Sequence, residues 1–343
     1  MSSDINILSE LKRIEKKIFH ELTRKTPFSP FLDLTKIPLP MFRDTFQRPD
    51  FPQRYFKLIN GLDSDSRSLV DSMICRLQKA LDSAAPPWDI HTSEEKNIFN
   101  DAQEKIFGQI VKLSDDMFVY GNYILPKKIF DPGVFYFNYG LGYVQDISKT
   151  KNKDILDLGA YIGDSMLLLA PYTNKKVYSF EAHPTSYQDL QKTIKLNNIA
   201  NSMPINMAVG DSNGSIRIRG RMDDLPATTT KASIRTKEDP NKKHLEFEDT
   251  IPVITIDSFV QEHNLDVGLI KVDIEGAEKA FLNGAMHTIA TQKPIILLSI
   301  YHYPDDFFDL KPMLEDMNLG YKFKIVRGSL NILSGTLLIA EVY

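Results

Sequence analysis

The chain has 343 residues, of which 42% are hydrophobic and 25% are charged, so it is long enough for a complete α/β core and an accessory region. Its formal net charge of -4 argues against a nucleic-acid partner, because proteins that grip phosphates concentrate Lys and Arg on one face. A single cysteine, Cys75, excludes an internal disulfide framework and a multi-cysteine zinc site, and its apolar sequence neighbours predict a buried thiol.

The N-terminal 120 residues are expected to form a mainly helical accessory region. Residues 1–10 lack the pattern of a signal peptide, and no segment approaches the roughly 20 apolar residues that span a bilayer, so we expect a cytoplasmic protein without a membrane span. The prolines between residues 27 and 52 predict an irregular segment. Before them, apolar residues recur at helical spacing at Ile7, Leu11, Ile14, Ile18 and Leu22.

Two further helices and a hairpin are expected before the main domain, residues 121–343. One helix covers Ser66–Leu81, and another begins at Thr92, where Glu95 has the spacing of a capping box. The apolar stripe of the second helix comprises Phe99, Ala102, Ile106, Ile110 and Leu113. The β-favouring runs Phe118–Tyr120 and Val134–Phe137 predict a hairpin that leads, through residues 121–150, into the main domain.

After Lys153 the sequence alternates between strands and helices, which is typical of a parallel sheet with crossover helices. Strands are expected at Ile155–Leu158, Val177–Phe180, Pro204–Val209, Leu269–Val272 and Ile295–Ile300. Helices are expected at Gly163–Ala170, at Thr185–Asn197, from Ala277 to Ile289 and near Asp305–Met317. In the helix at Thr185–Asn197, Gln188 is expected to close a capping box. A short strand is expected at Ser215–Arg219. The segment after it, residues 220–250, is long and has no apolar period, so we expect a lid or substrate loop there. Tyr321–Val326 and Thr336–Glu341 predict an antiparallel edge hairpin. The expected fold is therefore α/β, with a Rossmann-like, mostly parallel sheet and an N-terminal, mainly helical region.

The first motif with chemical content is the turn from Asp157 to Asp164, D-L-G-A-Y-I-G-D, after the first of these strands. Ligands of open α/β sheets bind at the carboxyl ends of strands; here Gly159 permits close backbone approach, and Gly163 opens a helix whose N-terminus offers free N–H groups. A dinucleotide site would have the spacing G-x-G-x-x-G, whereas this turn has G-x-x-x-G. The negative charge of Asp157 would repel a pyrophosphate but suits a sulfonium ligand that carries an ammonium group. The motif therefore favours S-adenosylmethionine over NAD.

The second motif is Glu181, which ends the second strand about 20 residues beyond the glycine turn. A carboxylate at this spacing can accept hydrogen bonds from both ribose hydroxyls. A single Glu at a strand end is alternatively a solvated loop residue, but the preceding glycine turn favours the ribose interpretation. Asn206 and Ala208, which lie where the third strand ends, are expected to wall the adenine.

The third motif is K-V-D-I-E-G-A-E, residues 271–278, after the fourth of these strands. If the strand continues to Glu275, Asp273 and Glu275 share a face, and Asp273 is the best candidate for orienting or deprotonating an acceptor hydroxyl. Glu278 lies at a helix start, where a carboxylate also favours the helix dipole. The alternative is that Asp273, Glu275 and Glu278 hold a divalent cation through oxygen ligands, although no metal is expected.

His302 follows the fifth strand, on the side where an acceptor would lie. A histidine with an ordinary pKa is a natural general base near neutral pH, so His302 joins Asp273 and Glu275 as a candidate catalytic residue. The alternative is a hydrogen-bonded loop histidine without a role in catalysis.

In this order the motifs resemble those of the FkbM family of S-adenosylmethionine-dependent methyltransferases. The resemblance covers about residues 130–343 and rests on D-L-G-A-Y-I-G-D, S-F-E-A-H-P, A-V-G-D and K-V-D-I-E-G-A-E. It implies a class I methyltransferase fold and methylation of a hydroxyl, commonly on sugars of surface polysaccharides or on secondary metabolites. The family usually has Asn at the position of Tyr161 and Pro at that of Ala182, which bears on adenosine contacts more than on the fold. The expected cofactor-binding residues are Asp157, Gly159, Ala160, Tyr161, Gly163, Asp164, Glu181, Ala182, Asn206, Ala208 and Asp273.

Three alternatives to a methyltransferase acting on a small-molecule or glycan hydroxyl remain at this stage. A non-catalytic module could have kept the S-adenosylmethionine pocket and act as a scaffold through its N-terminal region, residues 1–120. An NAD-dependent oxidoreductase is disfavoured by the glycine spacing. A nucleic-acid methyltransferase is disfavoured by the net charge and by the lack of an Asn/Asp-Pro-Pro-aromatic segment after the fourth strand.

Overall fold

The computed structural model describes residues 39–82, 92–221, 246–329 and 333–343, and residues 38–343 belong to one compact unit. The helix expected around Ile7 to Leu22 lies outside the described residues. Among the described residues, no helix combines the length and the apolar character that crossing a bilayer requires. The expected cytoplasmic location and the expected domain boundary near residue 120 remain predictions.

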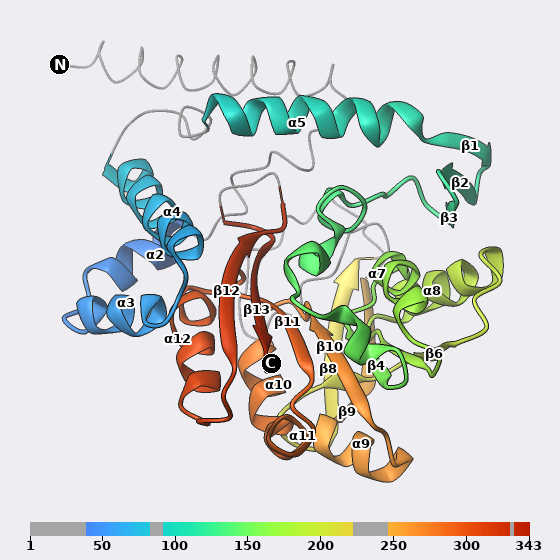
Figure 1. Ribbon diagram of the computed structural model, residues 1–343. Helices are drawn as coiled ribbons and strands as arrows, with labels where there is room; N and C mark the ends of the chain where they lie inside the picture. The colour runs from blue at the N-terminus through green and yellow to red at the C-terminus, as the bar shows by residue number, and fades with distance from the viewer. Residues whose placement is uncertain (1–38, 83–91, 222–245, 330–332) are drawn as a thin grey trace. The chain divides into compact units, whose positions relative to one another are not determined.

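The centre of the unit is a seven-stranded, mostly parallel sheet in the order β12-β13-β11-β10-β4-β5-β6 (Figure 1). Its strands are β4 (Asp154–Leu158), β5 (Val177–Phe180), β6 (Ser202–Ile205), β10 (Val267–Val272), β11 (Ile295–Ser299), β12 (Lys322–Arg327) and β13 (Thr336–Glu341). Every residue of β4, β10, β11 and β13 is buried, which is why these strands read as almost continuous apolar runs. β12 and β13 form the predicted antiparallel edge hairpin. This confirms the predicted fold class.

The strand order reverses between β4 and β10, because the chain continues from β4 to β5 on one side and returns to β10 on the other. In open α/β sheets such a switch point opens a crevice at the carboxyl ends of the two strands. Asp157 and Lys271 are register partners across this pair, so their side chains project from the same face. The fold therefore brings the first and third sequence motifs together at one edge.

The connecting helices follow the predicted order with local differences. They are α7 (Asp164–Leu169), α8 (Pro184–Leu196), α9 (Ile256–His263), α10 (Glu278–Gly284), α11 (Met286–Gln292) and α12 (Pro304–Glu315). The single helix expected from Ala277 to Ile289 is wrong, because the backbone leaves helical geometry at Ala285 between α10 and α11. The Thr185–Gln188 capping box does not form, since α8 already begins at Pro184. Helix α9 was not predicted from the sequence.

A second, three-stranded sheet lies beside the main one, in the order β7-β9-β8. Its strands are β7 (Ala208–Val209), β8 (Gly214–Arg221) and β9 (Glu246–Ile254). The single strand expected at Pro204–Val209 is therefore divided between β6 and β7, which belong to different sheets. The start and end of the expected 220–250 loop are strand, because β8 and β9 pair antiparallel as far as Arg221 and Glu246; residues 222–245 lie outside the described residues.

Within residues 39–82 and 92–105, which the structure describes, four helices precede this domain: α2 (Leu39–Phe46), α3 (Phe51–Ile59), α4 (Ser64–Asp82) and α5 (Ser93–Lys105). The irregular segment expected there is wrong from Leu39 onward, because Pro40 and Pro52 lie in the first turns of α2 and α3, where a proline needs no N–H partner. The helix near Ser66–Leu81 and the capping box of Thr92 and Glu95 are confirmed. Because α5 ends at Lys105, its predicted stripe does not extend to Ile110 and Leu113.

The hairpin expected from Phe118–Tyr120 and Val134–Phe137 is also wrong. β1 (Val111–Ser114), β2 (Met117–Tyr120) and β3 (Tyr123–Leu125) form a small antiparallel sheet of their own. Residues 132–135 are the short helix α6 (Pro132–Phe135), because Pro132 occupies the first turn and Asp131 caps it. Cys75 is exposed on α4, so the predicted burial of its thiol is wrong. Short 3-10 turns are η4 (Phe107–Gln109), η5 (Asn138–Tyr143), η6 (Ile147–Thr150) and η7 (Ala170–Tyr172).

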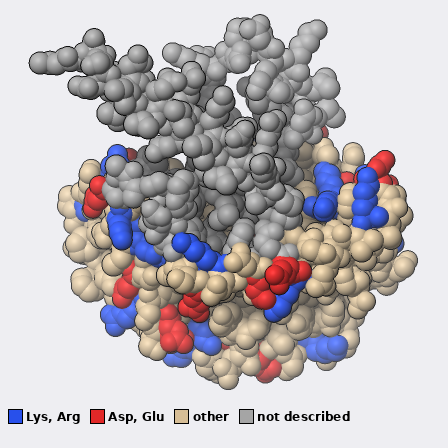
Figure 2. All heavy atoms as spheres, turned by 90° about the horizontal axis from the view of Figure 1, so that it is seen from above, with Lys and Arg blue, Asp and Glu red and all other residues tan. Residues whose placement is uncertain are grey.

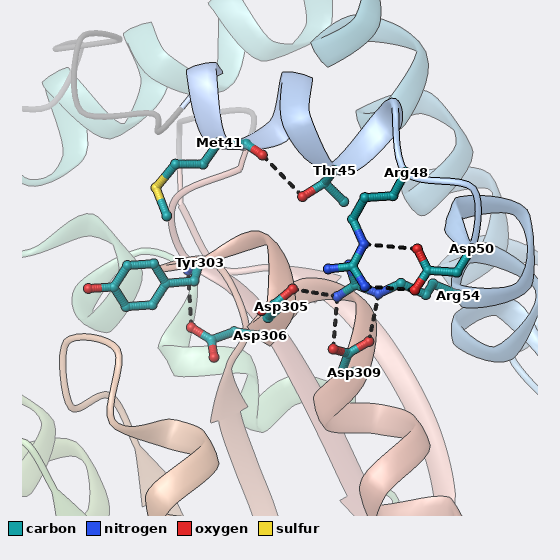
Figure 3. A network of polar contacts seen from close by, with 9 residues as sticks. All are labelled: Met41, Thr45, Arg48, Asp50, Arg54, Tyr303, Asp305, Asp306 and Asp309. Carbon is teal, nitrogen blue, oxygen red and sulfur yellow. Dashed lines mark hydrogen bonds and ion pairs between the residues drawn. The ribbon is translucent and has the colours of Figure 1, made fainter.

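Helix α3 is anchored to α12 by one buried guanidinium (Figure 3). Arg54 is 7% exposed, and it donates to both carboxylate oxygens of Asp309, at 2.9 and 2.8 Å, and to Asp305 at 2.7 Å. At the start of the same helix, the carboxylate of Asp306 accepts the backbone N–H of Tyr303 at 3.0 Å. Helix α12, which begins two residues after His302, is therefore held in place by α3 from the N-terminal part of the chain.

On the face in Figure 2, Lys and Arg side chains are interspersed with Asp and Glu over the described residues.

Candidate active site

Asp157 and Lys271 form a buried ion pair at the switch point. Asp157 is 0% exposed and Lys271 is 2% exposed, and the Lys271 ammonium lies 3.1 Å from the Asp157 carboxylate. Ser165 donates to both oxygens of Asp157, at 3.0 Å each, and Lys271 also donates to the Gly159 carbonyl at 2.6 Å. The charge of Asp157 is therefore balanced inside the protein. The pair ties the glycine turn to β10.

The glycine turn has the conformation that its sequence predicts, for a partly different reason. Gly159 and Gly163 have φ values of 79° and 91°, in the left-handed region. A Cβ on Gly159 would lie 1.8 Å from the backbone oxygen of Asp273, so the close approach is made by the chain's own third motif. The N–H groups of Gly159 and Ala160 both donate to the Phe180 carbonyl, which leaves neither of them free for a ligand. The turn is thus built to hold β4, β5 and β10 in register.

Glu181 is held at the end of β5 by backbone donors. Its carboxylate accepts the N–H of Tyr161 at 2.8 Å and the N–H of His183 at 2.7 Å. Burial raises the pKa of Glu181 to about 7 in spite of these two hydrogen bonds. Asn206 donates to the backbone oxygens of Glu181 and Ala182, at 2.8 and 3.3 Å, so its amide supports this strand end.

Two further carboxylates lie near the same turn. Asp164 is 5% exposed at the start of α7, and the half-buried Asp131 caps α6, which packs against α7. Burial raises the pKa of Asp131 to about 6, and burial together with the charge of Asp131 raises the pKa of Asp164 to about 7. We call Asp131, Asp164 and Glu181 the loop cluster. The cation that acts on all three is Lys271, which is already paired with Asp157.

The third motif forms a tight turn. The strand ends at Val272 and does not continue to Glu275, which is a correction to the expected shared strand face. Glu275 and Gly276 have φ values of 57° and 97°, and a Cβ on Gly276 would lie 2.2 Å from the Tyr303 ring, so only glycine fits there. The turn directs Asp273 and Glu275 to the same imidazole, at 3.6 and 3.5 Å from its Nε2 atom.

That imidazole belongs to His302, whose side chain is 10% exposed. Its Nδ1 atom lies 3.0 Å from the Oε1 atom of Glu278, which is 0% exposed and also accepts the N–H of Ile274. Burial alone would lower the pKa of His302, but the charge and hydrogen bond of Glu278 outweigh it and raise the pKa to about 10. His302 is therefore a cation at neutral pH. We call Asp273, Glu275, Glu278 and His302 the turn cluster.

Two tyrosines complete the surroundings of Asp273. Tyr301 donates its hydroxyl to the Oδ1 atom of Asp273 at 3.0 Å, and the Tyr139 hydroxyl lies 3.1 Å from that of Ser299. Burial raises the pKa of both tyrosines well above the ordinary value, so they remain hydrogen-bond donors. Tyr139 has a φ of 45°, a conformation that costs an aromatic residue free energy and is typical of functional sites. Asp273 itself stays 25% exposed in its side chain.

A divalent cation has one geometric candidate among the described residues. Asp273, Glu278 and His302 offer ligand atoms within 4.8 Å of one another, with His302 in the place of the expected Glu275. The His302 cation already lies among these carboxylates and balances part of their charge. The expectation that no metal is needed remains a prediction.

Sequence reasoning missed several residues of this site. Lys271 belongs to a motif that was recognised, but its pairing with Asp157 depends on the strand order. Tyr301 follows the same strand as His302 but was not singled out. Asp131 and Tyr139 lie before the first central strand, in a segment whose place over the sheet no local pattern reveals. The structure brings Asp157, Asp164, Glu181, Asp273 and His302 to one edge of the sheet as expected. Ala208 instead lies in β7, paired with Val253.

Comparison with known proteins gives the following similarities. Residues 157–323 match the family model of the methyltransferase FkbM domain. The fold is similar to the crystal structure of methyltransferase FkbM from Methylobacillus flagellatus KT, with a TM-score of 0.52 and 18% sequence identity over 85% of this chain and 58% of that chain. The M. jannaschii tRNA m1G37 methyltransferase gives a TM-score of only 0.35, with 15% identity over 68% of this chain and 57% of that one. No curated protein matches this sequence.

Proposed function

We propose that this protein transfers the methyl group of S-adenosylmethionine to a hydroxyl of a sugar, a polysaccharide or a secondary metabolite, because residues 157–323 match the family model of the methyltransferase FkbM domain. The chain spans 58% of the length of the M. flagellatus protein, so its activity is argued from its own site. The observation that carries the proposal is the surplus of enclosed carboxylates around the glycine turn, which calls for a cationic ligand.

The loop cluster fits S-adenosylmethionine by the chemistry of its groups. Asp131, Asp164 and Glu181 have raised pKa values because burial is not balanced by a cation of their own. A ligand that brings a sulfonium and an ammonium would favour the ionised carboxylates. A pyrophosphate would add negative charge to the same enclosure. The balance of charge therefore supports the methyl donor over a dinucleotide.

Each residue of the donor side has a distinct part in this proposal. Glu181, held by the N–H groups of Tyr161 and His183, would accept the ribose hydroxyls. Asp157 acts through the turn that it holds with Lys271, because its own carboxylate is fully buried and paired. When bound, S-adenosylmethionine supplies a methyl group on a sulfonium; a hydroxyl oxygen can attack that methyl carbon in line, with S-adenosylhomocysteine as the leaving group.

On the acceptor side, Asp273 is the residue that would orient the hydroxyl and take up its proton. Tyr301 and His302 hold Asp273 from one side, and a quarter of its side chain remains exposed. His302 with a pKa of about 10 carries a proton, so it cannot serve as the base in this state. Its part would be to balance the charge of Asp273 and Glu275 and to hold their side chains in place. Proximity and orientation would supply most of the acceleration.

The donor part of the proposal is tested by titration calorimetry with S-adenosylmethionine. Asp157→Ala should abolish binding, because the turn loses its link to Lys271 and Ser165. Asp154→Ala is the matched control: it removes a buried Asp from the other end of the same strand and should retain binding. Unchanged affinity in Asp157→Ala would contradict the assignment.

The acceptor part is tested with donor labelled in its methyl group. Neutral sugars, glycan extracts and amine-bearing analogues of the same compounds are incubated with the protein, and the methylated product is identified by its methoxy signal in NMR. Label on oxygen supports the proposal. Label found only on nitrogen, or binding of the donor without transfer to any acceptor, would contradict O-methylation and favour the alternative of a non-catalytic module.

A further inference from the structure

Three residues with ring side chains follow β11 in direct succession, and the last of them, Tyr303, lies beside the turn cluster. The first two are engaged with each other and with Asp273: the ring centroids of Tyr301 and His302 lie 4.1 Å apart, and Tyr301 donates its hydroxyl to Asp273. The Tyr303 ring instead lies against Gly276, where a Cβ would collide with its Cε2 and Cδ2 atoms. The glycine therefore lets this ring lie directly on the backbone of the turn.

The position of Tyr303 is fixed by the start of α12. Its backbone N–H donates to the Asp306 carboxylate at 3.0 Å, and its carbonyl accepts the N–H groups of Asp306 and Phe307, at 3.0 and 3.2 Å. The same helix is anchored to α3 by the ion pair of Arg54 with Asp309. Figure 3 shows the Tyr303 ring directed away from this network. A ring that is held in this way loses little conformational freedom when a ligand binds to it.

The Tyr303 side chain stays partly open to solvent at the edge of the turn cluster. The residue is half-buried. Burial, then the charge of Asp306 and then the charges of Glu278 and Glu275 raise the pKa of its hydroxyl, so the ring extends into the field of the turn cluster. Two carboxylates of the cluster are also partly open, since the side chains of Asp273 and Glu275 are 25% and 34% exposed. An aromatic ring and two accessible carboxylates thus border one region.

The chemistry of these groups selects one class of acceptor. An ionised carboxylate only accepts hydrogen bonds, so its ligand must bring donors such as hydroxyl groups. An aromatic ring offers a flat apolar surface, which needs an apolar face on the ligand. A pyranose has both features, because one face of its ring is lined by C–H groups and its rim carries hydroxyls. An open-chain polyol lacks the rigid apolar face, and a flat aromatic compound carries few donors.

We propose that Tyr303 is a specificity-determining residue that binds the C–H face of a pyranose acceptor while a hydroxyl of the same sugar ring reaches Asp273. The inference rests on the proposed function and narrows its acceptor to a ring-form sugar, free or within a glycan. An aliphatic side chain could cover Gly276 equally well, but only a flat ring offers a continuous surface to a sugar.

The test compares ring-form and open-chain acceptors in the full chain. The probes are methyl glucopyranoside, methyl galactopyranoside and methyl mannopyranoside, and the alditols glucitol, galactitol and mannitol. Transfer of labelled methyl from S-adenosylmethionine gives kcat and KM for the wild type, Tyr303→Leu and Tyr303→Phe. Tyr178→Leu is the matched control, because it removes another half-buried tyrosine, which packs on Phe259 in a ring contact outside both clusters. Donor affinity from calorimetry and unfolding in urea verify that each variant is folded.

The inference predicts a change in KM that depends on the shape of the acceptor. At least one hexopyranoside should have a lower KM than its alditol in the wild type. Tyr303→Leu should raise that KM about tenfold, the effect of losing an aromatic contact, and change kcat and the alditol KM by less than about twofold. Tyr303→Phe keeps the ring and should retain the wild-type KM. Tyr178→Leu should leave both KM values unchanged.

The possible failures are distinguishable. An unchanged hexopyranoside KM in Tyr303→Leu, an equal rise for ring and open-chain acceptors, or a loss confined to kcat overturns the role of Tyr303 while the proposed function stands. A wild type that methylates alditols as well as hexopyranosides overturns the preference for a ring-form sugar. A wild type that binds the donor but methylates none of the six probes overturns a sugar as the acceptor in the proposed function, and this inference with it.

Discussion

The loop cluster and the turn cluster lie at the same edge of the sheet and are both rich in carboxylates, but they differ in the source of their positive charge. In the turn cluster, His302 lies among Asp273, Glu275 and Glu278 and is protonated by their presence. In the loop cluster, the charge of Lys271 acts on Asp131, Asp164 and Glu181, but burial outweighs it and the pKa values of all three are raised.

This difference indicates what each cluster is built for. A cluster that contains its own cation is complete before any ligand arrives, and its geometry is preorganised. A cluster that lacks one is destabilised by its own repulsion until a cationic ligand enters. The difference agrees with the proposed function, in which a neutral hydroxyl approaches the turn cluster and the charged methyl donor binds at the loop cluster. The charge of Lys271 acts on carboxylates of both clusters, but its ammonium group is paired with Asp157, which belongs to neither.

The largest expected effect comes from Lys271→Met, which leaves the fully buried Asp157 without its cation. Unfolding in urea should show a loss of about 3–5 kcal/mol in the free energy of unfolding, the usual result of breaking a buried pair. The double variant Asp157→Asn with Lys271→Met should recover most of it. Lys153→Met, which breaks an exposed pair with Asp266, should lose at most about 1 kcal/mol. If Lys271→Met and Lys153→Met lowered the free energy of unfolding by the same amount, burial of the Asp157–Lys271 pair would be unimportant for stability.

The next effect is catalytic and concerns the turn cluster. Asp273→Asn keeps the hydrogen bond from Tyr301 but removes the proton acceptor, so kcat should fall about 100-fold at saturating donor. The measurement is the rate of label transfer to an accepted sugar. Asp266→Asn changes an exposed carboxylate directly before β10, at the opposite end of the strand from Asp273, and should leave the rate unchanged. A wild-type rate in Asp273→Asn would remove Asp273 from the chemistry.

A smaller effect tests whether Glu278 is the source of the charge on His302. Glu278→Gln should lower the pKa of His302, because the nearest carboxylate becomes neutral, and the NMR shifts of the imidazole protons against pH would report the change. We expect kcat to fall about tenfold as the hold on Asp273 weakens. If the His302 pKa stays where it is, the other carboxylates suffice and the turn cluster does not depend on Glu278.

The smallest effect is a pH dependence that only the loop cluster should show. Burial raises the pKa of Asp164 and Glu181 to about 7 and of Asp131 to about 6, so these groups hold protons in the free protein below those values. The ammonium group of a bound ligand favours the ionised carboxylates, so affinity for S-adenosylhomocysteine should rise about tenfold from pH 5.5 to 7.5 and binding should release protons. Calorimetry in buffers of different ionisation enthalpy measures that release. Methylthioadenosine, which lacks the ammonium, should show a weaker rise, and an affinity that falls with pH would reverse the assignment.

Much of the fold follows from local sequence patterns. The segments that form β4, β5, β10 and β11 are mostly apolar and bounded by turn residues. A strand that is buried on both faces needs apolar side chains on both, so its sequence is a nearly continuous apolar run. The wrong predictions concern segments whose local sequence pattern fits more than one type of secondary structure. The run from Val134 to Phe137 suits a strand, yet Asp131 and Pro132 start a helix there. The prolines at 40 and 52 read as breaks, but the first turn of a helix accepts proline.

The sequence by itself determined the glycine turn, the carboxylates at the ends of three strands and the order of those strands along the chain. Spacing along the chain carries that information, because strand ends gather at one edge. Only the tertiary structure decided the charge of these groups. Lys271 balances the charge of Asp157, and Glu278 stabilises the protonated form of His302. Both contacts join residues that are distant in sequence. Since a pKa depends on burial and on neighbouring charges, no local motif could have assigned it.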